Sequence, residues 1–149
     1  MPKGQVMKLS KYHRGIAGFT LIEMLVTIAV AGILMAIAIP RFYAVLPGIR
    51  LASAARQVAT DLQLARMTAI SRRANQVVTF NPPTGVYTFG ANNRDLNQLY
   101  PGTTVSNVAG GDPTFNTVGA ANATTTITLS NNGVNRQILV NLAGRVFTQ

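Results

Sequence analysis

One acidic side chain, Glu23, lies inside a long apolar segment and calls for a chemical explanation. Between Met24 and Pro40 the segment carries no charge, and Thr27 is its only polar side chain. As a helix, residues 19–40 would be about 33 Å long, which matches a hydrocarbon core of about 30 Å. An ionisable group without a partner deep in that core costs about 2.5 kcal/mol or more. Because a simple anchor gains nothing from such a group, Glu23 predicts an ionic partner.

A cut between Gly18 and Phe19 would supply that partner. The cut creates a free α-amine on Phe19, about one helical turn before Glu23. Ammonium and carboxylate could then neutralise each other, within one chain or between two packed chains. A carboxylate in the first turn also interacts favourably with the positive end of the helix dipole. The amine does not exist before cleavage, so cleavage would enable the pairing.

The same segment resembles the class III signal of type IV prepilins and pseudopilins. The resemblance lies in the run Gly18-Phe19-Thr20-Leu21-Ile22-Glu23, in the apolar helix after it, and in Pro40. It implies that a prepilin peptidase cuts after Gly18 on the cytoplasmic side and N-methylates Phe19. It also implies that the apolar helices pack in the core of a filament, where Glu23 meets the N-terminus of a neighbouring subunit.

An ordinary secretory signal peptide is the alternative reading of this segment. Residues 24–35 could serve as its apolar region, and Ala36-Ile37-Ala38 has the small-x-small pattern of a signal peptidase site. Glu23 inside the apolar block and Pro40 directly after it both argue against that reading. We therefore favour the prepilin interpretation.

The composition provides few side chains that could act in catalysis. The chain has 149 residues and no cysteine, which excludes disulfides, a thiol nucleophile and thiolate metal ligands. Its single histidine, His13, lies before the expected cleavage site, and the acids of the remaining chain are scattered. No phosphate-binding loop, metal-ligand spacing or nucleophile elbow is present. We expect no catalytic residue, no cofactor and no metal, and we predict that the protein is not an enzyme.

The charge distribution predicts an orientation in the membrane. The formal net charge is +9, and four of the positive residues precede the apolar helix, namely Lys3, Lys8, Lys11 and Arg14. Without them the chain has nine arginines and four acids, so its net charge is about +5. The basic leader keeps the N-terminus cytoplasmic. Everything after Pro40 should then lie outside the inner membrane.

The pattern of the chain indicates an α+β fold: a long N-terminal helix packed on a small antiparallel sheet head. We expect four segments: a cleaved leader (1–18), a membrane or filament helix (19–40), its amphipathic continuation (41–74) and a β-rich head (75–149). Pro40 and Pro47 predict a kink or a non-helical stretch within residues 40–48. The apolar face expected after it consists of Leu51, Ala55, Val58, Leu62, Ala65 and Ala69, widened by Ala54, Leu64 and Ile70. Polar residues of this helix, Asp61 among them, are expected mostly elsewhere.

Turn signals divide the head into strands. Residues 76–80 and 86–89 flank a Pro- and Gly-containing loop, which predicts a hairpin. Residues 124–130 and 134–140 alternate around Asn131-Asn132-Gly133, the clearest hairpin signal in the chain. A short strand around Val105 and Val108 and a last strand at residues 145–148 are also expected. Residues 91–102 are predicted to be mostly loop, and residues 110–123 a flexible surface loop.

A second resemblance covers the helix and the end of the chain. Residues 61–73, the following Val77-Val78-Thr79-Phe80 and the ending Leu142-Ala143-Gly144-Arg145-Val146 are similar to GspH/FimT-type pseudopilins. This implies a minor subunit of the type II secretion pseudopilus, assembled through its N-terminal helix to support protein export. The alternative is a FimT-like minor type IV pilin involved in pilus assembly or DNA uptake. Either role implies other pseudopilins or pilins, the prepilin peptidase and the inner membrane as partners.

The arginines of the head raise the question of DNA binding. Some FimT-like minor pilins bind DNA through a C-terminal Gly-Arg-x-Arg turn, which makes Arg145 a candidate for a weak DNA contact. Here Phe147 stands in place of the second arginine. Arginine can bind phosphate wherever it is exposed. We nevertheless favour a solvated basic face with charges at helix ends and turns, and DNA is not the preferred partner.

Overall fold

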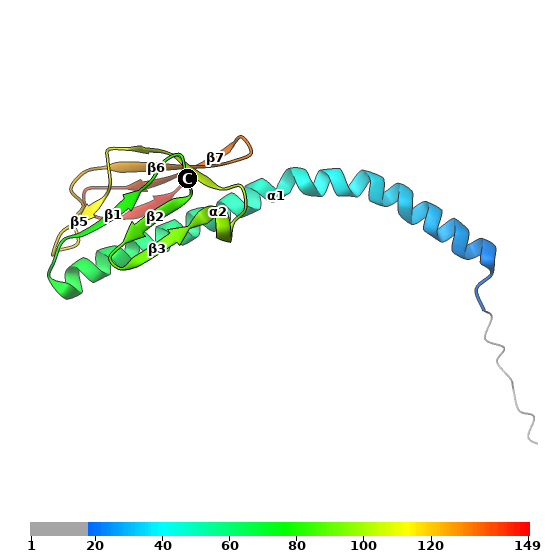
Figure 1. The fold of residues 1–149 in the computed structure, drawn as a ribbon, viewed down its shortest axis with the longest axis horizontal. Helices are drawn as coiled ribbons and strands as arrows, with labels where there is room; N and C mark the ends of the chain where they lie inside the picture. The colour runs from blue at the N-terminus through cyan, green and yellow to red at the C-terminus, as the bar shows by residue number, and fades with distance from the viewer. Residues whose placement is uncertain (1–17) are drawn as a thin grey trace, which may run out of the picture. The chain divides into compact units, whose positions relative to one another are not determined.

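The computed structural model describes residues 18–149, so the predicted leader lies outside the described residues except for Gly18. The described chain divides into two compact units, the first ending at Ile39 and the second spanning Pro40–Gln149. Helix α1 (Leu21–Arg72) contributes residues to both units (Figure 1). Its first part, up to Ile39, exposes every side chain. Among the described residues, α1 is the one helix long and apolar enough to cross a membrane, a property that signal sequences share.

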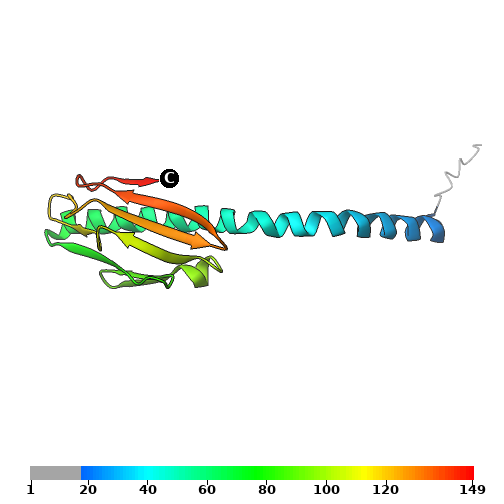
Figure 2. The same cartoon turned by 90° about the horizontal axis from the view of Figure 1, so that it is seen from above.

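The second unit combines the C-terminal part of α1 with two antiparallel sheets of four strands each. The first sheet has the order β3-β2-β1-β5, and the second has the order β4-β6-β7-β8. The elements of the first sheet are β1 (Gln76–Phe80), β2 (Val86–Phe89), β3 (Asn92–Asp95) and β5 (Thr114–Phe115). The second sheet contains β4 (Thr104–Ala109), β6 (Thr125–Asn131), β7 (Val134–Val140) and β8 (Val146–Thr148). A short helix, α2 (Leu96–Leu99), follows β3. Figure 2 shows β6 and β7 running across the helix.

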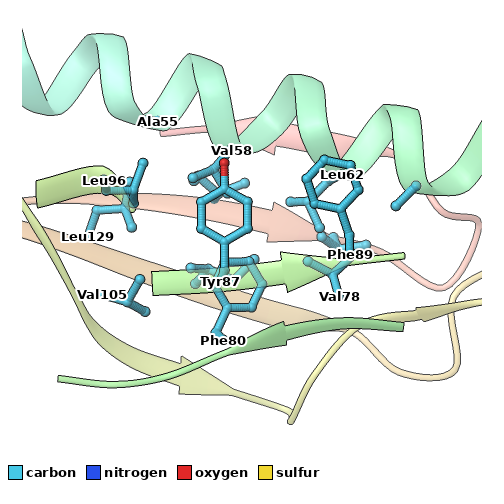
Figure 3. Close-up of a cluster of buried hydrophobic side chains, with 14 of the residues drawn as sticks. Ala55, Val58, Leu62, Val78, Phe80, Tyr87, Phe89, Leu96, Val105 and Leu129 are labelled. Atoms are coloured by element: carbon cyan, nitrogen blue, oxygen red, sulfur yellow. The ribbon is translucent and has the colours of Figure 1, made fainter. Parts of the chain in front are cut away.

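Both sheets pack against one face of α1 to form the core. All six residues of the predicted apolar face are buried, as is Ala54. In Figure 3, Ala55, Val58 and Leu62 face Tyr87 and Phe89 of β2, with further core side chains from both sheets around them. The aromatic rings of the first sheet stack. The ring centroids of Phe80 and Tyr87 are 5.3 Å apart, and those of Tyr87 and Phe89 are 6.3 Å apart. The predicted α+β architecture, with a long helix on an antiparallel head, is confirmed.

Two hairpins form where the turn residues predicted them. β1 pairs with β2, and their bounds are those expected. β6 pairs with β7 around Asn132 and Gly133, which have φ angles of 49° and 81°. Positive φ at both central residues defines a type I′ turn, whose twist matches that of the two strands. Asn and Gly tolerate this conformation better than other residues, so the local sequence was sufficient to predict the hairpin.

One alternative predicted for residues 40–48, a non-helical stretch, is wrong because the helix continues through both prolines, whereas the other alternative, a kink, stays a prediction. Pro40 and Pro47 both lie inside α1, and residues 40–48 are helical. A proline removes one backbone donor, and the remaining hydrogen bonds on either side maintain the helix. The predicted widening of the apolar face was also wrong for two residues, because Leu64 and Ile70 are 45% and 44% exposed.

Two segments expected to be loops contain regular structure. Within residues 91–102, the polar strand β3 pairs with β2, and the Asp95 carboxylate caps α2 by accepting hydrogen bonds from the backbone N–H groups of Asn97 and Gln98. Within residues 110–123, β5 pairs with β1 and buries Phe115 completely. These elements are short, and β3 lies at a sheet edge. Neither shows the apolar alternation on which the strand predictions depended.

Arg73 ends α1 with a Schellman motif. Its φ angle is 50°, in the left-handed region. The N–H of Ala74 donates to the carbonyl of Ala69 at 3.2 Å, and the N–H of Arg73 donates to that of Ile70 at 3.3 Å. This pair of bonds satisfies carbonyl groups that the helix would otherwise leave without a donor.

Candidate functional site

The predicted cleavage site lies just outside the first turn of α1. Gly18, Phe19 and Thr20 are not helical, and the helix begins at Leu21. The Thr20 hydroxyl oxygen accepts a hydrogen bond of 3.3 Å from the backbone N–H of Glu23, and the Thr20 carbonyl accepts one of 3.2 Å from Met24. Thr20 is therefore the N-cap of α1 and Glu23 is its N3 residue. The side chain of Phe19 is 73% exposed.

Glu23 lies in the first turn of α1, where its charge complements the helix dipole. Within residues 18–149 its carboxylate takes part in no ion pair. The backbone carbonyl of Glu23 accepts a hydrogen bond from the hydroxyl of Thr27. Gly18 and Phe19 thus lie directly before the helix, and Glu23 lies in its first turn. The partner predicted for Glu23, an α-amine on Phe19, would exist only in a chain cut after Gly18.

The C-terminal part of α1 contains a buried acid, Asp61, whose predicted position was wrong. Asp61 is only 3% exposed, although we expected it away from the apolar face. Its Oδ2 accepts a hydrogen bond of 2.6 Å from the Tyr87 hydroxyl and one of 3.2 Å from Gln57 Nε2. Arg94 Nε lies 3.6 Å from the same oxygen, which is an ion pair without a hydrogen bond. A carboxylate can remain buried when such partners compensate for its lost hydration.

The position of Asp61 in the sequence did contain a usable signal. Asp61 follows Val58 by three residues and precedes Ala65 by four, which is the spacing of residues on one helix face.

Figure 3 shows the Tyr87 ring extending from β2 with its oxygen toward α1. Burial and the hydrogen bond to Asp61 raise the pKa of the Tyr87 hydroxyl well above its usual value. The hydroxyl therefore stays protonated and remains a donor.

All three aspartates of the second unit, Pro40–Gln149, accept hydrogen bonds from neighbouring groups. Asp61 binds Tyr87, Asp95 caps α2, and Asp112 Oδ1 accepts a hydrogen bond of 3.1 Å from the backbone N–H of Phe80. Within residues 18–149 the one ion pair joins Arg94 and Asp61. The other arginines of the head therefore have no carboxylate within 4.0 Å in the described part of the chain.

The Gly-Arg turn near the C-terminus is fixed by its glycine and its backbone. Gly144 has a φ of 71°, and a Cβ at this position would lie 2.0 Å from the Gly119 carbonyl oxygen and 2.9 Å from Arg66 Nε. Arg66 Nε itself donates to the Gly119 carbonyl at 2.8 Å. Glycine is therefore required here by close approach as well as by conformation.

Arg145 contributes its backbone to this turn. Its N–H donates to Asn141 Oδ1 at 2.9 Å, and its carbonyl accepts from the N–H of Asn141 at 3.0 Å. The side chain of Arg145 is exposed. We expected the charge of Arg145 to serve the turn, whereas the turn is held by backbone groups and the Asn141 amide.

A cavity of about 330 Å³ lies beside the C-terminal end of α1. Arg72 is the only charged residue that lines it, and Leu64 and Phe89 supply apolar surface. Its other lining residues are Thr68, Gln76, Gly90, Ala91 and Asn92. The lining thus offers one cation and several neutral hydrogen-bonding groups. Elsewhere in residues 18–149, no three His, Cys, Asp or Glu side chains gather in a way that could hold a metal ion.

Solved structures with a similar fold are minor pilins. Two crystal forms of the type IV minor pilin FimU from Pseudomonas aeruginosa PAO1 match this chain with TM-scores of 0.55 and 0.57. Each is 20% identical and covers 66% of this chain, and the matches span 92% and 87% of the two FimU chains. At this identity the likeness establishes the pilin fold of the head. A comparison with the curated proteins found no match.

Two family models match the chain in succession. The prokaryotic N-terminal methylation motif covers residues 13–39, and the model described as Type II transport protein GspH covers residues 54–144. The first match and the apolar start of α1 support membrane anchoring of a pilin-like protein. The second spans most of the head, from the buried face of α1 to the Gly-Arg turn. The chain therefore belongs to the family of the Type II transport protein GspH, whose members are pilin-like structural subunits.

Proposed function

We propose that this protein is a minor pseudopilin of the type II secretion pseudopilus, similar to its H subunit, which joins a tip complex and supports protein export. The observation that carries the proposal is the GspH family match over residues 54–144. The match to the methylation motif over residues 13–39 supplies the assembly signal that such a subunit needs. Before assembly, the protein would reside in the inner membrane with its N-terminus cytoplasmic and its head periplasmic.

Processing would convert the precursor into an assembly-competent subunit. Prepilin peptidase would cut between Gly18 and Phe19 and N-methylate the new amine of Phe19. The ammonium of Phe19 and the carboxylate of Glu23 would then neutralise each other, most favourably between neighbouring subunits in the apolar filament core. The absence of an ion pair at Glu23 within residues 18–149 fits a carboxylate that acquires its partner after the cut.

The apolar part of α1 has the surface that helix packing needs. Its side chains are exposed, and small residues recur at Ala29, Gly32 and Ala36. Small residues let neighbouring helix backbones approach closely in an apolar medium. Other pseudopilins or pilins would be the partners of this surface.

N-terminal sequencing of the mature protein tests the proposal directly. The expected first residue is a methylated Phe19, whereas a secretory signal peptide would release a soluble protein beginning near Ile39. Gly18→Leu should leave unprocessed precursor in the inner membrane. Gly32→Leu is the matched control, because neither glycine has an atom within 4 Å of an added Cβ. Normal processing of the Gly18 variant would rule out prepilin peptidase as the processing enzyme.

A FimT-like minor type IV pilin is the second candidate. The similarity of the head fold to FimU favours it, although that likeness concerns the fold. Deletion of the gene distinguishes the two roles. Loss of exoprotein secretion supports the type II pseudopilus, and unchanged secretion with loss of pili supports the type IV pilus. Neighbouring genes for a secretin and a secretion ATPase, or for twitching and DNA uptake, provide an independent check.

A further inference from the structure

The start of α1 is set by a single side chain at the second position after the predicted cut. The Thr20 hydroxyl oxygen accepts a hydrogen bond from the backbone N–H of Glu23. The Thr20 carbonyl oxygen accepts one from the backbone N–H of Met24. The N–H of Glu23 is one of the groups that a helix start leaves without a partner, and the bond from Met24 is the first hydrogen bond within the helix. The helix consequently begins at Leu21, and Gly18, Phe19 and Thr20 remain outside it.

The Gly18–Phe19 peptide is open on all sides within the described part of the chain. An added Cβ on Gly18 would meet no atom within 4 Å, and Phe19 is 73% exposed. Within residues 18–149, therefore, no neighbouring atom restricts the side chain at position 18. Access to this bond depends on where the helix begins, because a peptide inside the helix has its backbone groups in intrahelical hydrogen bonds.

We propose that Thr20 is a positioning residue for prepilin cleavage: its hydroxyl ends the helix so that the Gly18–Phe19 peptide stays outside the helix and available to the peptidase. This inference rests on the proposed function, in which the peptidase cuts at this bond. The reaction is a hydrolysis. The oxygen of water bonds to the Gly18 carbonyl carbon and the C–N bond to Phe19 breaks. Gly18 leaves as a carboxylate, and both protons of the water pass to the Phe19 nitrogen, which becomes an ammonium.

Removal of the Thr20 hydroxyl would allow the helix to begin earlier. Gly18 is then the next residue able to act as an N-cap, since glycine is about as good a cap as threonine. With Gly18 as the cap, Phe19 becomes the first helical residue and the scissile peptide joins the helix. Only the fraction of precursor that keeps this peptide outside the helix could bind productively, so the apparent affinity for the peptidase falls by that fraction.

The test measures cleavage of the full-length precursor in detergent micelles by purified prepilin peptidase. Thr20→Val removes the hydroxyl and keeps the branched shape of the side chain. Thr20→Ser and Thr20→Asn retain an oxygen that can cap the helix, in side chains of different shape. Thr27→Val is the matched control, because the Thr27 hydroxyl donates to carbonyls of the same helix at Glu23 and Met24 but caps nothing.

We expect Thr20→Val to raise KM about fivefold with little change in kcat, and Ser and Asn to restore the wild-type KM. Amide hydrogen exchange at Glu23, followed in the same micelles, should be faster in Thr20→Val than in Thr27→Val. An unchanged KM for Thr20→Val would overturn the inference. A defect that Ser repairs and Asn does not would also overturn it, because the peptidase would then read the hydroxyl directly. Failure of the wild-type precursor to be cut after Gly18 would instead refute the proposed function.

Discussion

The Tyr87 hydroxyl donates a hydrogen bond of 2.6 Å to Oδ2 of Asp61 and so joins the first sheet to the long helix. The two residues are 26 positions apart in the chain. Asp61 is charged and almost fully buried, so each of its partners replaces water that the carboxylate has lost. The head therefore depends on a polar contact in the middle of an apolar core.

Tyr87→Phe should destabilise the head by about 1.5–3 kcal/mol, the usual value of a buried hydrogen bond to a charged group. The ring and its stacking on Phe80 and Phe89 remain, so the loss isolates the hydroxyl. Urea denaturation of the full-length protein in detergent, followed by circular dichroism, measures the change. Tyr100→Phe is the control, because Tyr100 is only partly buried. Equal effects of the two substitutions would show that the Asp61 contact contributes nothing specific.

Stability should fall in alkaline solution because the pKa of Tyr87 is raised in the folded protein. Above pH of about 10, the ordinary pKa of tyrosine, the unfolded chain releases a proton that the folded chain retains. The stabilisation is complete below that pH and is lost as the pH rises toward the folded pKa, by at most about 1.4 kcal/mol per pH unit. Denaturation curves of wild type and Tyr87→Phe between pH 8 and 11 measure the difference. Parallel pH dependences would contradict this prediction.

Gly144→Ala should destabilise the head by about 2 kcal/mol or more. The new methyl group would meet the Gly119 carbonyl oxygen at 2.0 Å and would disturb the hydrogen bond that Arg66 donates to it. Gly133→Ala is the matched control, because Gly133 also has a positive φ but no atom within 4 Å of an added Cβ. The shift in denaturation midpoint should be clearly larger for Gly144. A smaller or equal shift would mean that the turn relaxes away from α1.

Glu23→Gln should leave processing intact and abolish or strongly reduce assembly. Glutamine keeps the shape of the side chain and its place in the first turn, but it cannot neutralise the ammonium on Phe19. Mass spectrometry of the N-terminus reports processing, and shearing of filaments from cells that overproduce the subunits reports assembly. Normal incorporation of the Gln variant would show that the charge of Glu23 has no role in packing.

Arg145→Ala should change the stability of the head by no more than about 0.5 kcal/mol, because the turn is held by backbone groups and Asn141. If the arginines after residue 49 form one surface, duplex DNA should bind the wild-type protein weakly, without sequence preference and with an affinity that falls steeply with salt. Gel shifts at two salt concentrations measure this, with the exposed Arg136 changed to Ala as control. Tight binding at physiological salt that Arg145→Ala abolishes in a folded head would establish DNA as a partner.

The sequence by itself determined the features that depend on near neighbours in the chain. The prepilin signal, the apolar helix, the buried stripe from Leu51 to Ala69 and the hairpin at Asn132-Gly133 all follow from spacings within a few residues. Gly18, Phe19 and Glu23 form a local group for the same reason. The proposed pairing of Glu23 with an amine would require more, because it would depend on cleavage and on neighbouring subunits.

The tertiary structure decided what depends on residues far apart in the chain. From the sequence alone, Asp61 is expected at the surface. In the structure, Tyr87 and Arg94 of the first sheet contact its carboxylate and replace the water that would hydrate it. From the sequence alone, Gly144 is an ordinary turn residue. In the structure, Gly119 and Arg66 lie so close to it that a side chain at this position would clash. β3 and β5 have no alternation of apolar and polar residues. They form strands because their backbone groups hydrogen-bond to those of β2 and β1, respectively. Such contacts form between elements that the sequence places tens of residues apart, and local propensity carries no information about them.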